Sequence, residues 1–118
     1  MQVMRVAIHD SKGLIGHADL TASDPPMCAA SGPFSPEPTY DPLEHANVID
    51  GEYLGDRTAN LRVTSEAHGE IESHSIAILD WPALKEVQLD VVGIIRPSYD
   101  ALFMDDPDFR AYRTNADG

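Results

Sequence analysis

The chain has 118 residues, of which 20 are Asp or Glu and 8 are Lys or Arg, so that its formal net charge at pH 7 is −12. This length predicts one domain, spanning residues 1–118. The acidic balance argues against direct binding to nucleic acid phosphates or to anionic lipid, because both need clustered basic side chains. A single cysteine, Cys28, excludes an intrachain disulfide and a multi-cysteine metal site.

The charges are distributed unevenly. No Lys or Arg lies between Lys12 and Arg57, a stretch that holds eight carboxylates. The N-terminus has no basic segment followed by a long apolar run, and the apolar run at 91–95 is too short to span a bilayer. We therefore expect a cytoplasmic protein without membrane contact.

The first elements predicted are two strands of a hairpin. Residues 3–8 and 14–20 each alternate apolar side chains with others, as half-buried strands do. A three-residue loop at 11–13, closed by Gly13 in the left-handed region, would keep the even-numbered apolar side chains on one face. The register that this loop predicts is Met4 opposite Leu20, Arg5 opposite Asp19, Val6 opposite Ala18, Ile8 opposite Gly16 and Asp10 opposite Leu14. Arg5 and Asp19 would then form an ion pair on the outer face.

A proline-rich segment follows. Residues 22–41 contain five prolines, a density that neither a central strand nor a helix tolerates. The segment is therefore predicted to be a long, stiff loop that packs on the domain. After it, Asp41, Pro42 and Glu44 carry the signature of a capped helix start, and the helix is expected to run to about Ile49.

The second half is predicted to be a three-stranded meander. Alternating apolar residues indicate strands at 59–64, 70–80 and 86–95. The residues from 98 to 112 predict two short helical turns, and residues 114–118 are expected to fray. No internal repeat at a fixed spacing is visible. The resulting fold class is α+β, with a mostly antiparallel sheet of about five strands.

No residue pattern specifies a reaction. Cys28 lies in an acidic, apolar stretch, which favours a small packed residue over a thiol nucleophile. The histidines lack the spacing of metal ligands, so neither a metal nor a cofactor is expected. His17 and Asp19 share a strand face, and together with His74 they are the candidates for a pocket.

One stretch carries a resemblance. Asp24-Pro25-Pro26-Met27, followed by Gly32-Pro33-Phe34, Pro36 and Tyr40, resembles a loop pattern in small bacterial proteins of unknown function. That pattern has glycine at the position of Cys28. The resemblance implies a self-contained domain and no active-site residues.

Three hypotheses about function follow from these observations. The first is a non-enzymatic interaction or regulatory protein that binds another protein with a basic surface, using Met27, Phe34 and Tyr40 on the stiff loop. The second is a small enzyme or ligand-binding domain with a pocket between the loop and the sheet, although an enzyme is the less favoured reading. The third is a structural component of a larger assembly, and a homo-oligomer is compatible with each hypothesis.

Overall fold

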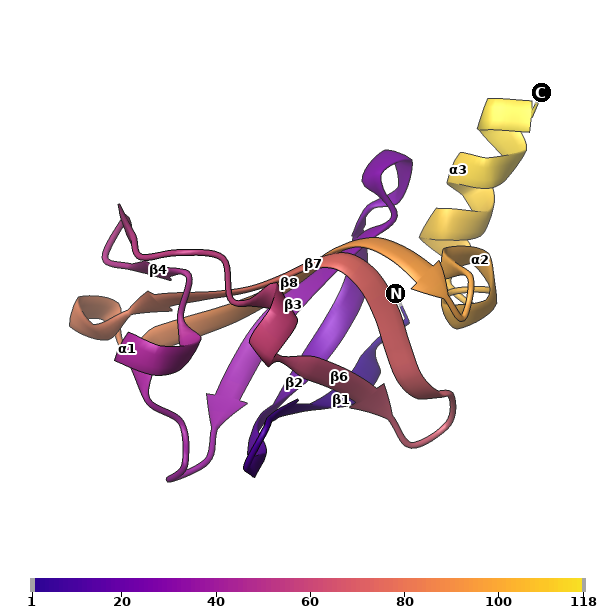
Figure 1. Ribbon diagram of the computed structural model, residues 1–118. Coiled ribbons are helices and arrows are strands. Elements are labelled where there is room, and N and C mark those ends of the chain that lie inside the picture. The colour runs from indigo at the N-terminus through magenta and orange to yellow at the C-terminus, as the bar shows by residue number, and fades with distance from the viewer. Residues whose placement is uncertain (1, 118) are drawn as a thin grey trace.

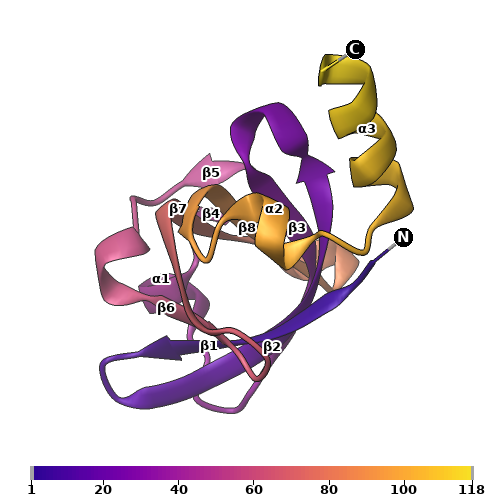
Figure 2. The same ribbon diagram turned by 90° about the vertical axis from the view of Figure 1, so that its right-hand side faces the viewer.

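The protein is described by a computed structural model, which gives the backbone of residues 2–117 and the side chains of residues 2–112. Six strands pair side by side until the last meets the first, which closes a mostly antiparallel barrel (Figures 1 and 2). In their order around the barrel they are β1 (Met4–Asp10), β2 (Gly13–Asp24), β3 (Ala29–Pro36), β8 (Glu86–Arg96), β7 (Gly69–Trp81) and β6 (Arg62–Ser65). The prediction of an antiparallel sheet is confirmed, but closure into a barrel was not predicted.

The barrel interior is the hydrophobic core. Alternate residues of each strand point inward, because successive side chains of a strand lie on opposite faces. The apolar side chains that alternate along β1 and β8 meet in this core: Met4, Val6, Ile8, Leu89 and Val91 are buried, and Val87 packs against them. Side chains fill this interior, as expected for a barrel of few strands.

The predicted register of the β1–β2 hairpin is confirmed from Met4 to Ile8, and Arg5 Nη1 lies 3.2 Å from Asp19 Oδ1. The predicted turn is wrong. Asp10 pairs with Gly13 across a two-residue loop, because the Asp10 carboxylate accepts from the backbone N–H groups of Lys12 and Gly13. A β-bulge takes up the extra residue, and Ile15 is fully buried as a result.

The prediction of a loop over residues 22–41 is also wrong, because residues 29–36 form β3 in the barrel wall. Two features of the strand accommodate its prolines. Pairing with β2 is interrupted at Gly32 and Pro33, and Pro33 is the last residue of β3 to pair with β8. Gly32 allows the strands to approach closely, since a Cβ at this position would lie 1.8 Å from the carbonyl oxygen of Asp19. The prolines before β3 begin a 3-10 turn, η1 (Pro25–Met27).

Three short elements link the two halves of the barrel. The helix α1 (Pro42–His45) begins where the sequence predicts, capped by Asp41, but it ends after one turn. The strand β4 (Val48–Ile49) follows, pairs parallel to β7 and turns back into β5 (Glu52–Tyr53). Asp50 and Gly51 connect β4 and β5, both with positive φ, as in a type I′ turn. The prediction of a helix to Ile49 is therefore wrong, because Val48 and Ile49 belong to this hairpin. After it, η2 (Thr58–Asn60) leads into β6.

The strands β7 and β8 and the C-terminal helices agree with the sequence prediction, with η3 (Pro82–Leu84) as the turn between the strands. Ser98 caps α2 (Tyr99–Leu102), and Asp106 caps the start of α3 (Pro107–Asp117). The backbone of residues 114–117, predicted to fray, is helical, and Gly118 lies outside the described residues. Figure 1 shows α1 and α2 at opposite ends of the barrel, here called the α1 end and the α2 end.

The chain uses one arrangement of elements twice. The series β1–β2–η1–β3–α1 is repeated, after β4, β5 and η2, by β6–β7–η3–β8–α2. From the 3-10 turns onward, equivalent residues of the two halves lie 57 positions apart. The turns begin at Pro25 and Pro82 and are followed by the left-handed residues Cys28 and Lys85. The helix N-caps are Asp41 and Ser98. The halves join antiparallel through β1–β6 and β3–β8, which gives the barrel an approximate two-fold arrangement. The repeat is invisible in the sequence because, of residues 24–47, only Pro25 meets an identical residue 57 positions later.

Candidate functional site

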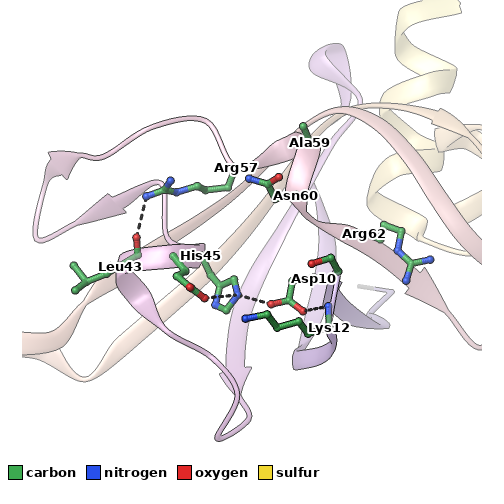
Figure 3. A pocket seen from close by; sticks show the side chains of 10 residues that line it. Asp10, Lys12, Leu43, His45, Arg57, Ala59, Asn60 and Arg62 are labelled. Carbon is green, nitrogen blue, oxygen red and sulfur yellow. Dashed lines mark hydrogen bonds and ion pairs between the residues drawn. The ribbon is translucent and has the colours of Figure 1, made fainter.

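The α1 end carries a cleft of about 560 Å³ (Figure 3). The turn between β1 and β2 forms one wall, α1 forms a second and η2 forms a third. Most of the residues that line it are polar or charged: Asp10, Ser11, Lys12, Glu44, His45, Arg57, Asn60 and Arg62, with Leu43 and Ala59 as the apolar members. Three of the chain's eight Lys and Arg residues therefore meet at this one cleft.

A buried histidine lies at the boundary between the core and the cleft. The His45 side chain is only 5% exposed, and its Nε2 lies 2.9 Å from Oδ2 of Asp10. The backbone N–H of Asp41 donates to His45 Nδ1 over 2.9 Å. His45 thereby takes the place that the sequence assigns to Glu44, whose carboxylate was expected to reach back to the helix N-cap.

These two contacts fix the state of the imidazole ring. Because Nδ1 accepts a hydrogen bond, the ring proton lies on Nε2 and is donated to Asp10. The hydrogen bond from His45 is the main cause of a lowered pKa at Asp10, and the backbone N–H of Lys12 adds to it. Asp10 is therefore an anion held by internal donors, and His45 has no ring nitrogen free to act as a base.

A second hydrogen-bonded pair, Tyr40 and Asp80, lies next to His45. The Tyr40 hydroxyl donates to Oδ2 of Asp80 over 2.7 Å, and Asp80 is buried. Burial, then the hydrogen bond to Asp80, raises the pKa of Tyr40 well above its ordinary value. The Tyr40 ring stacks on His45 and meets Phe34 edge to face, with centroids 5.7 and 5.3 Å apart. Aromatic packing thus continues from the barrel interior to the cleft.

Arg57 fixes the wall that faces α1. Its Nε donates to the carbonyl oxygen of Ala46 and its Nη2 to that of Leu43, so that it satisfies carbonyls that the end of a helix leaves unpaired. Thr58, next along the chain, accepts from the backbone N–H of Ile76 in β7. These bonds hold η2 in place, and with it Asn60.

The residues predicted for a pocket lie elsewhere and do not form one site. His17 in β2 lies with its Nδ1 3.7 Å from a carboxylate oxygen of Glu37, on the outer face of the barrel. Asp19 is paired with Arg5. His74 is exposed in β7, beside Gly93 of β8. The structure therefore does not bring the three residues to a common point.

The residues predicted for an interaction loop do not share one exposed surface, although the rings of Phe34 and Tyr40 are in contact. Met27 is exposed in η1, Phe34 is buried in the barrel and Tyr40 is half-buried beneath the cleft. Cys28, a small packed residue in the sequence interpretation, is partly buried against the core. Among the described residues, no group of three or more His, Cys, Asp or Glu side chains is arranged to hold a metal ion, and no helix has the length and apolar character needed to cross a membrane.

Sequence reasoning missed Asp10, His45 and Asp80 as members of one cluster. His45 follows the N-cap Asp41 by four positions, so it was within reach of the N-cap backbone, and this was the one local signal available. Asp10 and His45 lie 35 residues apart, and no local pattern connects them. A scan against protein-family models, a search of curated proteins and a search of solved structures each returned no match.

Proposed function

We propose that the protein is a non-enzymatic binding protein that recognises another protein through its α1 end. The observation that carries this proposal is the contrast between the two ends of a barrel built from two equivalent units. At the α2 end, Leu102, Phe103 and Phe109 are all buried. At the α1 end, the equivalent positions are His45 and Ala46, and an open polar cleft lies beside them. The fold closes one end with apolar side chains, so the polar α1 end is not a requirement of the architecture.

Exposed apolar side chains surround this end. Leu43 is 74% exposed, Tyr53 is 67% exposed and Leu54 is 37% exposed. They lie within the stretch free of Lys and Arg, together with the carboxylates Asp50, Glu52 and Asp56. Exposed apolar groups beside these carboxylates favour a partner that supplies both apolar contact and the opposite charge. The partner is therefore expected to be a protein with a basic surface.

The state of the His45–Asp10 pair supports binding over catalysis. A general base needs a lone pair within reach of the substrate proton. Both ring nitrogens of His45 are engaged inside the protein, and the Asp10 carboxylate accepts three hydrogen bonds. The pair fixes α1 against the β1–β2 turn, which is a structural role that shapes the binding surface.

Capture with matched variants tests the proposal. Wild-type protein immobilised in lysate of its source is expected to retain a partner that elutes as salt is raised, since charge attraction between exposed groups is screened by salt. The partner, once purified, is expected to bind a Leu43→Ser/Tyr53→Ser double variant at least about tenfold more weakly. Met27→Ser removes an apolar side chain that is 57% exposed and lies in η1, outside the α1 end, and is the control. Equal binding by both variants, or no partner released by salt, would contradict the proposal.

A second candidate function is binding of a small monoanion, such as a carboxylate, in the cleft. It is favoured by Lys12, whose ammonium has no ion-pair partner among the side chains that the structure describes. The cleft offers three cations, of which Arg62 lies 3.9 Å from a carboxylate oxygen of Glu70, against the carboxylates of Asp10 and Glu44, so its charge suits at most a single negative charge.

The two lysines of the chain provide the measurement. Lys12 lines the cleft and Lys85 follows η3, so ¹³C-methylated lysines give one reporter at the site and one control. Titration with acetate is expected to shift the Lys12 signal in a saturable way and to leave the Lys85 signal in place. Parallel, non-saturating shifts of both signals would reject a carboxylate site.

A further inference from the structure

We propose that the partner binds by strand addition: an extended basic segment pairs with the open side of β5. This inference rests on the proposed function for the identity of the partner as a protein, and it adds the mode of recognition. In the part of the chain that the structure describes, β5 is the one strand with a single strand neighbour, because the barrel strands close on one another and β4 lies between β5 and β7.

The hairpin geometry directs one residue of β5 outward. Ile49 and Glu52 flank the two-residue turn, and Val48 pairs with Tyr53 next along the ladder. The backbone N–H of Leu54 then donates to the carbonyl oxygen of Asn47 over 2.7 Å. Hydrogen-bonded and non-hydrogen-bonded pairs alternate along an antiparallel ladder, so Val48 and Tyr53 form a non-hydrogen-bonded pair. The N–H and C=O of Tyr53 therefore point away from β4, toward the open side, where an added strand would bond to both.

The side chains at this edge decide the chemistry of the incoming segment. Glu52 and the turn residue Asp50 are exposed carboxylates, and Asp56 follows β5. The nearest cation in the chain, Arg57, is already bonded to two carbonyl oxygens of the α1 region. Natural sheet edges are protected by short length, charged side chains, bulges or proline, and β5 has only its two-residue length and the charge of Glu52, which a basic segment would neutralise. An extended segment of alternating basic and apolar residues complements the carboxylates and the exposed ring of Tyr53.

Amide hydrogen exchange by NMR gives the direct test. The probe is a short, end-blocked peptide of alternating lysine and valine. Saturating peptide is expected to slow exchange of the Tyr53 amide by about tenfold or more, because that N–H gains a hydrogen-bond partner. The same peptide with N-methyl groups on alternate residues lacks the donors of one edge and is expected to bind about tenfold more weakly. If shifts spread over the whole acidic surface and the Tyr53 amide exchanges as before, strand addition is wrong.

Two variants of one residue separate backbone pairing from side-chain contact. Both Tyr53→Ser and Tyr53→Pro remove the ring, but only the proline removes the outward N–H. The proline breaks no bond to β4, since that N–H is not used within the hairpin, so the fold is expected to persist. Tyr53→Pro is expected to bind the peptide about tenfold more weakly than Tyr53→Ser, with unchanged core amide shifts as the check on folding. Equal affinities would overturn strand addition.

The inference and the proposed function fail in different ways. If the captured partner needs Leu43 and Tyr53 side chains but binds Tyr53→Ser and Tyr53→Pro equally, the α1 end remains the binding surface and strand addition is excluded. If the peptide protects the Tyr53 amide while no salt-sensitive partner exists in lysate, the edge is competent for pairing and the proposed function is wrong.

Discussion

His45 is held by hydrogen bonds at both ring nitrogens and is buried at the α1 end. The equivalent position in the second half is Leu102, which is fully buried in an apolar setting. The two halves thus place a hydrogen-bonded polar side chain and an apolar one at the same point of the fold. Replacing His45 by leucine therefore measures what the polar cluster contributes to the free energy of unfolding.

We predict that His45→Leu destabilises the protein by about 1–3 kcal/mol at pH 7, because the Asp10 carboxylate and the Asp41 N–H each lose a buried partner. His45 is the main cause of the lowered pKa of Asp10. A carboxyl whose pKa is lowered by folding stabilises the protein above about pH 4, its ordinary pKa, and this stabilisation is lost as the pH falls through the lowered value. Urea unfolding across this range is expected to show the wild-type advantage shrinking as the pH falls.

Glu44→Gln is the control for this prediction. The Glu44 carboxylate lies 3.9 Å from His45 Nε2 and is 62% exposed, so its removal is expected to change stability little. An advantage of wild type over His45→Leu that grows with acidification would contradict the assigned role of Asp10.

Tyr40 gives a prediction at the opposite end of the pH scale. Its pKa is raised in the folded protein by burial and by the hydrogen bond to Asp80. A group that stays protonated in the folded state stabilises it below the ordinary pKa, about 10 for tyrosine, and this contribution falls as the pH rises further. Tyr40→Phe is expected to lose about 1–3 kcal/mol at pH 7, because Asp80 loses its donor, and to show a shallower decline above pH 10 in thermal unfolding.

Among the elements, β3 shows why proline content misled the sequence prediction. The strand tolerates Pro33 because the ladder to β2 is interrupted there, and it approaches β2 closely because residue 32 is glycine. Neither condition is visible in the local pattern, because both depend on how β3 pairs with β2, and the prediction of a loop gave these residues no strand partner. By contrast, β1, β2, β7 and β8 were predictable because apolar alternation is set by one buried face.

Gly32→Ala tests this reading of β3. The added Cβ would meet the Asp19 carbonyl, a backbone atom that cannot rotate away. We expect destabilisation at or above the top of the ~1–3 kcal/mol range for overpacking, measured as a lower urea midpoint. Ser31→Ala, one residue earlier, is the control and is expected to change stability little. A Gly32→Ala variant as stable as Ser31→Ala would contradict the close approach.

The β4–β5 hairpin was predictable in principle. Asp-Gly is a strong signal for a type I′ turn, but the preceding helix-cap pattern and the shortness of the two strands led to the prediction of a helix running to about Ile49. The cleft was less accessible, because Asp10, His45 and Arg57 meet only after the barrel has closed. Local sequence signals predicted the N-cap of α1. The contacts that join α1 to Asp10 and Arg57 and form the cleft are long-range, and no local pattern indicates them.

Gly51→Ala probes the same hairpin. Gly51 has φ of 85°, a region that alanine adopts at a cost of roughly 1 kcal/mol. We expect the β4–β5 amides to exchange faster while the barrel amides keep their protection, as measured by hydrogen exchange. Loss of protection throughout the barrel would show that the hairpin belongs to the cooperative core instead.

At the scale of the whole molecule, the net charge of −12 opposes the compact state through self-repulsion. Salt screens this repulsion, with a Debye length near 10 Å at about 0.1 M. The melting temperature is therefore expected to rise by a few degrees between low salt and about 0.5 M sodium chloride. A melting temperature that falls over this range would indicate that attractive ion pairs outweigh the repulsion.

The barrel itself depends on two seams that join the halves, β1–β6 and β3–β8. These seams place α1 and α2 at opposite ends, and the polar cleft and the β5 edge follow from that placement (Figures 1 and 3). The most direct measurement is interstrand backbone NOEs in solution. Contacts between Val6 and Ser65 and between Ala30 and Val91 are both expected in the same sample. Contacts across one seam without the other would mean an open sheet, and the two-ended barrel would be wrong.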